Sequence, residues 1–443
     1  MVSLESFLIK QALSVDELKG KIYSYREQEK IVNQWLKKRL DVILPKVMKR
    51  SGIDLWVVAC REYNEDPVFL SLVPASMMSA RRTSILVFHQ LEDGSVKKMA
   101  LTRPGVGLDD FYEAVWVNQK GSIWQDGNSN NVGETQFECL ARIIQEANPE
   151  KIGLNISEGF AFGDGLSKYL YDVLVSHLAE ADQKKIVSAE KLAIGWLETR
   201  LEEELAAYNG IVQIAHTLIA EAFSSKVILP GVTTNHDVKY FMLQKTIDLG
   251  LTPWFDYEVS ILRAGNKQIQ AEAIIMPGDI LHCDVGFKYL GLCTDTQENA
   301  YVLKADETDA PDDLKRILTD LNRLQDITIS NFKAGLSGNE ILAASLKQAI
   351  SEGIKPSIYT HPIGYHGHGA GPTIGLWDQQ GGVKLMGDYL LYNDTLHSLE
   401  LNVSLYLESW NQNITLGAET DLSFSNDQVH YCAGRQEKFH LIK

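Results

Sequence analysis

The chain has 443 residues, 45% of them hydrophobic and 23% charged, a composition typical of a globular protein long enough to form two domains. Its 42 basic and 58 acidic residues give a net charge of -16, which argues against binding to the phosphate backbone of a nucleic acid. No basic N-terminal region precedes a sustained apolar stretch, and no run of about 18 apolar residues occurs, so neither export nor membrane insertion is expected.

The first 194 residues alternate predicted helices with predicted strands. Ser14-Val15-Asp16-Glu17 has the form of a capping box and predicts a helix that runs to about Lys49 and ends at Gly52. Apolar and β-branched runs predict strands over 53–59, 82–89, 96–101, 151–156 and 185–188, with helices over 135–147 and 166–178. This alternation predicts an α/β N-terminal domain whose boundary lies near residues 190–198.

The remaining residues mix helices with hairpins. Thr199-Arg200-Leu201-Glu202 has capping-box form and predicts a long helix to about Phe223, and a similar motif at residue 234 predicts another that ends at Gly250. From Asp256 the pattern changes to strands, with two further helices over 311–332 and 338–353. The five cysteines form no CxxC pair and no disulfide framework, which favours free thiols in a cytoplasmic protein.

Two aspartates, Asp284 and Asp295, lie in a segment that predicts a hairpin turning at Tyr289-Leu290. In such a hairpin Asp284 faces Asp295, with both side chains on one side of the strands. Like charges opposed at about 5 Å are destabilising, so the pair needs a compensating positive charge, for which one or two metal ions are natural candidates. Aspartates that splay into solvent are the alternative.

Two later strands place further carboxylates on polar faces. Residues 396–405 alternate polar and apolar side chains and put Glu400 on the polar face, and the following strand does the same with Glu419. The intervening turn, 361–372, is rich in histidine and glycine, and the glycines around His368 allow close approach of the backbone to a site. Four carboxylates and one imidazole suit two divalent ions such as Mn, Co or Fe.

This ordered set resembles the ligands of the pita-bread metallopeptidases, the family that includes Xaa-Pro aminopeptidases, prolidase and methionine aminopeptidase. The residues that match in order and approximate spacing are Asp284, Asp295, His368, Glu400 and Glu419. The resemblance implies a creatinase-like α/β domain over residues 1–194, an α+β pita-bread catalytic domain over 195–443, and a homodimer.

The resemblance also implies roles for these residues. Asp284 would chelate one ion, and Asp295 and Glu419 would bridge two. His368 and Glu400 would complete the second site. Two divalent ions, with manganese favoured over cobalt, iron and zinc, would hold a hydroxide nucleophile and stabilise the oxyanion formed when it attacks a carbonyl. Glu400 is the expected proton shuttle.

Several residues that position a peptide in the family differ in this chain. The second histidine, seven residues after the ligand, would be residue 375, which is glycine, and the histidine four residues before the ligand is Gly364. An arginine two residues before the last ligand, which can grip a substrate carboxylate, is Gly417. Gln297-Glu298 replaces the Thr-Arg that follows the second aspartate.

Nearby residues are candidates to replace the missing groups. His366 is a candidate catalytic residue, His361 and Trp377 are candidate substrate-binding residues, and Asp378 is a possible further acid or base. The predicted function is a metal-dependent hydrolase of the Xaa-Pro aminopeptidase or dipeptidase type that acts on small peptides. The alternatives are a pita-bread hydrolase or lyase that acts on a small non-peptide molecule, and a non-catalytic scaffold, against which the five retained ligand positions argue.

Overall fold

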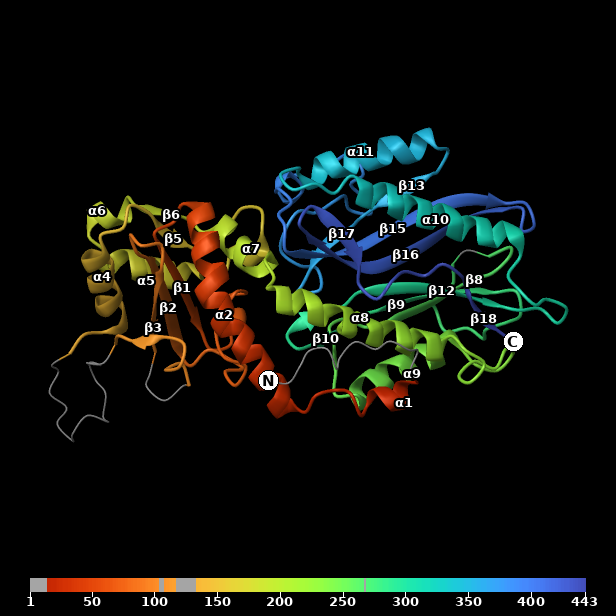
Figure 1. Cartoon of the computed structure of the whole chain (residues 1–443), viewed down its shortest axis with the longest axis horizontal. Helices are drawn as coiled ribbons and strands as arrows, with labels where there is room; N and C mark the ends of the chain where they lie inside the picture. The colour runs from red at the N-terminus through yellow and green to blue at the C-terminus, as the bar shows by residue number, and fades with distance from the viewer. Residues whose placement is uncertain (1–13, 103–106, 117–132, 267) are drawn as a thin grey trace. The chain divides into compact units, whose positions relative to one another are not determined.

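The computed structural model describes residues 14–102, 107–116, 133–266 and 268–443 (Figure 1). The chain divides into two compact units. One unit is Tyr25–Leu197, and the other combines the chain up to Ser24 with Glu198–Lys443. Within the described part of the chain, none of the helices combines the length and the apolarity that crossing a bilayer requires.

The N-terminal unit contains a six-stranded sheet in the order β4-β3-β2-β1-β5-β6. Its strands are β1 (Leu55–Arg61), β2 (Thr83–Gln90), β3 (Val96–Leu101), β4 (Glu113–Ala114), β5 (Ile152–Leu154) and β6 (Ile186–Ser188). Its helices are α2 (Tyr25–Ser51), α3 (Phe69–Leu72), α4 (Gln136–Ala147), α5 (Lys168–His177), α6 (Glu180–Gln183) and α7 (Glu190–Glu198), with a 3-10 turn, η2 (Ala161–Gly163). Apolar side chains of β1, β2 and β5 pack with those of α4 and α5 in one core, which confirms the predicted α/β architecture.

The predicted helix from Ser14 to Lys49 is two helices. Ser14 does form the expected capping box, but α1 covers only Val15–Leu18, and α2 begins at Tyr25. Gly20 lies in the break, and glycine disfavours a helix interior by about 1 kcal/mol relative to alanine. The chain passes from one unit to the other between these two helices.

The second unit contains a nine-stranded sheet whose main path is β13-β15-β16-β12-β9-β8. Its strands are β8 (Glu258–Leu262), β9 (Ile280–Val285), β12 (Thr296–Val302), β13 (Pro356–Ile358), β14 (His361–Ile363), β15 (Thr395–Leu407), β16 (Gln412–Ser425), β17 (Gln428–Tyr431) and β18 (His440–Ile442). A three-stranded sheet is formed by β7 (Thr252–Pro253), β10 (Phe287–Tyr289) and β11 (Leu292–Cys293).

Four long helices accompany this sheet, α8 (Glu202–Ala222), α9 (Asn235–Asp248), α10 (Asp312–Ser330) and α11 (Gly338–Ser351), with a 3-10 turn, η3 (Met386–Asp388) (Figure 1). The N-cap of α8 is Leu201 rather than the predicted Thr199, because Glu204 reaches back to accept the Leu201 N–H at 2.7 Å. These helices and the sheet confirm the predicted α+β architecture.

One face of β15 and β16 is apolar and the other is polar. Leu399, Leu401 and Val403 of β15 pack in a buried cluster with leucines and isoleucines of α10, such as Leu314 and Ile317. Side chains alternate between the two faces of a strand, so the residues between these leucines point away from α10. The acidic residues of the strands therefore lie on the face opposite the hydrophobic core.

Candidate metal centre

The hairpin that carries the two aspartates has a different register from the predicted one. Leu290 and Gly291 form the turn, both with positive φ (52° and 80°), as in the two-residue turns that match the twist of a hairpin. Asp284 is consequently opposite Gln297 and not opposite Asp295. A shift of two residues preserves the face of every side chain, so both aspartates still point to the same side.

Four acidic residues and one glutamine form a row across β8, β9, β12, β16 and β15. Each lies directly opposite the next in the strand register, and directly opposed residues point to the same face of a sheet. The members of this carboxylate row are, in order, Glu258, Asp284, Gln297, Glu419 and Glu400. Such a row of like charges is unfavourable unless protons or cations neutralise it.

His361 brings a ring nitrogen to this row from β14. Its Nε2 atom lies 3.3 Å from Glu419 Oε1 and 3.7 Å from Asp295 Oδ2. Possible ligand atoms of His361, Glu400 and Glu419 lie within 4.8 Å of one another, and so do those of Asp284, Asp295 and Glu419. Glu419 belongs to both groups, so it is placed where a carboxylate can bridge two cations.

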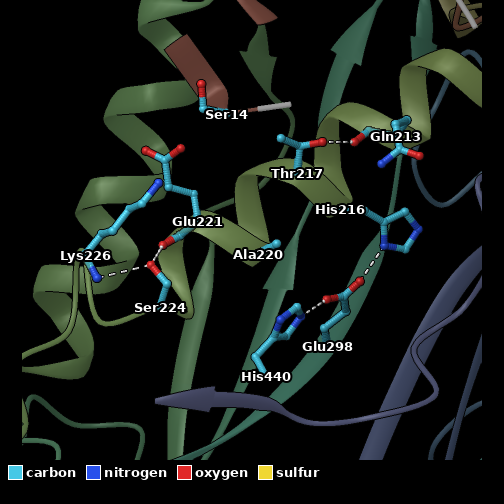
Figure 2. Close-up of a pocket in the computed structure, with 10 residues that line it drawn as sticks. All are labelled: Ser14, Gln213, His216, Thr217, Ala220, Glu221, Ser224, Lys226, Glu298 and His440. Atoms are coloured by element: carbon cyan, nitrogen blue, oxygen red, sulfur yellow. Dashed lines mark hydrogen bonds and ion pairs between the residues drawn. The ribbon is translucent and has the colours of Figure 1, made fainter. Parts of the chain in front are cut away.

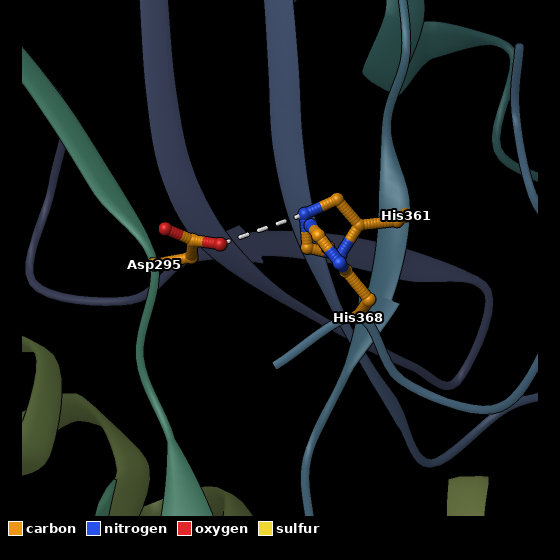
Figure 3. Close-up of side chains that lie close together, drawn as sticks. All are labelled: Asp295, His361 and His368. Atoms are coloured by element: carbon orange, nitrogen blue, oxygen red, sulfur yellow. Dashed lines mark ion pairs between the residues drawn. The ribbon is translucent and has the colours of Figure 1, made fainter. Parts of the chain in front are cut away.

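His368 joins a third group, with Asp295 and His361 (Figure 3). The two imidazole rings are nearly perpendicular, with centroids 4.9 Å apart. His361 is 8% exposed, whereas His368 is exposed to solvent. The two histidines therefore differ in surroundings, His361 being enclosed with the carboxylates and His368 lying at the edge of the site.

Burial and mutual repulsion raise the pKa values of the carboxyl groups. Burial, followed by the charge of Glu419, raises the pKa of Glu400 to about 9. Burial raises the pKa of Glu419 to about 7. Burial and the charge of Glu419 also hold the pKa values of Asp284 and Asp295 well above the ordinary range. Without a cation, Glu400 therefore stays mostly protonated near pH 7.

The donor set fits divalent metal ions. Among the described residues, Asp284 Oδ1, Asp295 Oδ1 and His361 Nε2 are buried atoms without a hydrogen-bond partner. Buried polar atoms are normally satisfied, and unsatisfied ones need an explanation such as an ion. Carboxylate and imidazole ligands without a thiolate suit Mn and similar ions, and the five cysteines are free, buried thiols.

Hydrogen bonds from neighbouring residues orient the carboxylates. Gln297 Nε2 donates to Glu400 Oε1 at 2.6 Å, and Ser398 Oγ donates to Glu419 Oε1 at 2.6 Å. The Asp295 N–H donates to Asp421 Oδ2 at 3.2 Å. These partners are distant in the sequence and are brought together only by the folded sheet.

The other candidate site residues lie apart from the three groups of possible ligands. His366 is half-buried and belongs to none of those groups among the described residues. Trp377 and Asp378 occupy a tight turn closed by paired backbone hydrogen bonds between Leu376 and Gln379, and Trp377 is 78% exposed. Their predicted roles in catalysis and binding stay predictions.

Trp254 packs against the edge of His368, with ring centroids 5.3 Å apart. Its Nε1–H donates to the carbonyl of Thr294, the residue before Asp295, at 2.8 Å. Gly367 makes this packing possible, because a Cβ atom there would lie 2.2 Å from the indole ring. The indole therefore limits the positions that the His368 ring can take.

A separate cluster of titratable groups lies on the other face of β12 (Figure 2). Glu298 is buried and hydrogen-bonds to His216 of α8 through one oxygen and to His440 of β18 through the other. These groups form part of the lining of a cavity of about 420 Å³. Burial opposes ionisation of Glu298, but the two histidines outweigh it and lower its pKa to about 2. These two hydrogen bonds connect α8 and β18 to β12, the strand that also carries Gln297.

The fold and site define the chain as a two-unit pita-bread protein with a creatinase-like N-terminal unit, which confirms the resemblance given by the sequence. Residues 207–388 match the model of metallopeptidase family M24, a family whose activity depends on metal. This match covers most of α8, the helices α9 to α11, the two aspartates and both histidines of Figure 3.

Solved structures share this fold over nearly their whole length. X-Pro aminopeptidase from Thermotoga maritima is 15% identical, with a TM-score of 0.62 over 89% of this chain and 99% of that one. Xaa-Pro dipeptidase from Bacillus anthracis is 18% identical, with a TM-score of 0.58 over 92% and 100%. Prolidase from Pyrococcus furiosus is 13% identical, with a TM-score of 0.54 over 88% and 99%. No curated protein matches the chain.

Proposed function

We propose that this protein is a metallopeptidase that uses two divalent cations, with manganese favoured, to hydrolyse peptides of the Xaa-Pro type. One observation carries the proposal, namely the enclosure of four carboxylates and His361 in overlapping groups of possible ligands. The M24 match and the fold shared with Xaa-Pro peptidases support it. Such ions would supply a deprotonated water for attack and would stabilise negative charge on the carbonyl oxygen.

We also propose that His361 is the histidine ligand and that His368 is the second histidine, seven residues later. This exchanges the roles expected from the sequence. The support is the enclosure of His361 beside Glu419, against the exposed position of His368. With His361 as ligand, the spacing of the family's second histidine is retained, so one reason for doubting a peptide substrate disappears.

The remaining proposed ligands keep the roles given by the resemblance. Asp284 would hold one ion, Asp295 and Glu419 would be shared by both, and Glu400 would complete the second site; the possible ligand atoms of these residues lie in overlapping groups. Bound cations would keep Glu400 ionised, so its carboxylate would also be able to accept the proton of the attacking water. Residues 195–443 form the proposed catalytic domain, and residues 1–194 form the proposed creatinase-like domain.

His368 is proposed to bind the carbonyl oxygen of the substrate. Partial burial and neighbouring His361 lower its pKa to about 4, so the ring is neutral near pH 7. A neutral imidazole has one N–H to donate, and such a donor stabilises an oxyanion where charge develops. Trp254, packed on the ring edge, favours one orientation of this donor.

The substrate that fits best is a peptide whose C-terminal carboxylate does not have to bind beside the metal centre. Beside the carboxylate row lies a row of uncharged residues that consists of Ser260, His282, Asn299, Gly417 and Asn402. Residue 417 is a glycine, so it offers no cationic side chain to bind the carboxylate of a substrate. This uncharged row favours a longer peptide over a free dipeptide, and it keeps a small non-peptide substrate as the second candidate.

Metal analysis followed by peptide assay tests the proposal. The protein loaded with Mn would be assayed with an Xaa-Pro dipeptide, a longer Xaa-Pro peptide and a longer peptide without proline. We expect hydrolysis of the longer Xaa-Pro peptide above both controls and loss of metal in Asp295→Asn. Bound metal without turnover of any peptide would instead support the small-molecule hydrolase or lyase. A cytoplasmic homodimer is the proposed form of the enzyme, and light scattering tests the dimer.

A further inference from the structure

Gln297 is the single uncharged member of the carboxylate row. It lies directly opposite Asp284 on one side and Glu419 on the other. Its side chain is 5% exposed, so water cannot satisfy its amide group freely. A buried amide needs partners for its N–H groups and for its oxygen, because an unpaired buried polar group destabilises the fold.

The amide of Gln297 has a defined orientation. The nitrogen donates to Glu400 Oε1 at 2.6 Å, and the side chain of Gln297 also hydrogen-bonds to Glu419. The oxygen points the other way, toward the His282 ring and Gly417, where a Cβ atom would lie 3.1 Å from it. Ionised carboxylates accept and do not donate hydrogen bonds, so the nitrogen is the end of the amide that suits Glu400.

We propose that Gln297 is a positioning residue that holds Glu400 in one orientation for proton transfer. This inference deepens the proposed function and rests on it. By occupying Oε1, the amide leaves Oε2 of Glu400 as the oxygen available to the reacting water or to a cation. A carboxylate at position 297 would add a fifth negative group to the row and would have no proton to donate when ionised.

The space for this arrangement comes from Gly417. A side chain at residue 417 would meet both the Gln297 oxygen and the His282 ring, at 3.1 and 3.2 Å from its Cβ atom. Asn299 completes the support, because its Oδ1 lies 3.0 Å from His282 Nδ1 and its amide nitrogen donates to the Gly417 carbonyl at 2.9 Å. The absence of a side chain at Gly417 therefore leaves room for the amide of Gln297 in its present orientation.

Gln297→Met tests the proposal, since methionine has a similar length but cannot donate a hydrogen bond. We expect kcat for the longer Xaa-Pro peptide to fall about 10–100-fold, the usual effect of removing a partner of a metal ligand, with KM and metal content unchanged. Gln297→Glu should lower kcat at least as far. Wild-type kcat in Gln297→Met, or a rise in KM alone, would overturn the proposal.

Gln436→Met is the matched control. Gln436 also bonds to β12, through the backbone N–H and carbonyl of Asn299 at 2.8 and 2.7 Å, but not to the carboxylates. If Gln436→Met lowers kcat as much as Gln297→Met does, the role of Gln297 is only to stabilise β12, and the proposal fails. Thermal unfolding of both variants shows whether the strand is weakened to a similar degree.

A spectroscopic measurement keeps this proposal separate from the proposed function. In the Co(II)-loaded protein, reorientation of Glu400 should change the visible bands in Gln297→Met and not in Gln436→Met. This readout needs no substrate, so it decides the role of Gln297 even if wild-type protein hydrolyses no peptide. An unchanged spectrum in Gln297→Met would overturn the positioning role.

Discussion

The Nε2 atom of His361 lies 3.3 Å from Oε1 of Glu419, the residue common to two groups of possible ligands. An imidazole in this position can bind the same ion as the carboxylate beside it. The more exposed His368 stands perpendicular to it at 4.9 Å. The two histidines are therefore expected to respond differently to substitution.

His361→Ala should retain fewer metal ions after dialysis than wild type, because a ligand is lost. His368→Ala should keep its metal and lose kcat by about 10²–10³-fold, the cost of removing one oxyanion donor. Elemental analysis and steady-state kinetics of both variants provide the measurement. The opposite pattern, with metal lost only from His368→Ala, would return the ligand role to His368.

The metal-free protein should become less stable as pH rises. The pKa values of Glu419 and Glu400 are raised from 4.5 to about 7 and about 9, so the folded state binds more protons than the unfolded state. Stability from this source is complete below about pH 4.5 and is lost as pH passes through 7 and 9. Thermal unfolding with a chelator should give a higher Tm near pH 6 than near pH 8.5.

Added Mn should change this pH dependence, because bound cations favour the ionised carboxylates. The increase in Tm on adding Mn should be larger near pH 8.5, where fewer protons compete. Asp295→Asn serves as the control and should show little response to Mn. An equal increase in Tm at both pH values would contradict coupling between metal binding and these carboxyl groups.

Glu298→Gln should destabilise the fold by about 1–3 kcal/mol near pH 7, because buried hydrogen bonds to a charged group are weakened. The pKa of Glu298 is lowered from 4.5 to about 2. Its contribution is therefore present above pH 4.5 and is lost as pH falls through 2. Denaturant unfolding of wild type and variant should converge toward acid pH.

Glu352→Gln is a matched control for that experiment. The pKa of Glu352 is also lowered to about 2, chiefly by Arg323, but the pair lies at the surface. Exposed ion pairs contribute little to stability because solvent screens them. If Glu352→Gln lost as much stability as Glu298→Gln, burial of the contacts to His216 and His440 would not explain the effect of Glu298→Gln.

Trp377→Ala should leave the Tm unchanged, since the side chain is 78% exposed and buries little apolar surface. If the indole contacts substrate as predicted, KM should rise 2–5-fold, equivalent to about 0.5–1 kcal/mol for an exposed aromatic contact. Trp410, which is partly buried against the hydrophobic core of the same unit, is the control. Trp410→Ala should lower the Tm without changing KM.

The strands of the catalytic unit were predictable from alternation, but their register was not. Period two was enough to place Asp284 and Asp295 on one face and Glu400 on the polar side of β15. The register depends on the turn, and leucine at positive φ, as at Leu290, is not a signal that sequence patterns provide. The predicted pairing was consequently displaced by two residues.

The histidines and Gln297 show a second limit of the sequence. His361 and His368 both fit a glycine-rich turn before the acidic strands, and the seven-residue interval between them was the signal that could have distinguished their roles. Gln297 was recognised as a departure from the family, but its partner Glu400 is 103 residues away. Its role depends on cross-strand neighbours that only the folded sheet brings together.

The second unit, which contains the candidate metal centre, includes a segment that precedes Tyr25 as well as Glu198–Lys443. Asp16 pairs with Lys245 at 3.1 Å, the Val15 N–H donates to Glu221, and the Tyr23 N–H donates to Tyr289 at 2.9 Å. During synthesis this short segment emerges well before its partners, and residues 25–197 can fold in the interval. A protein shortened to begin at residue 195 would therefore lack part of the unit that carries the candidate metal centre.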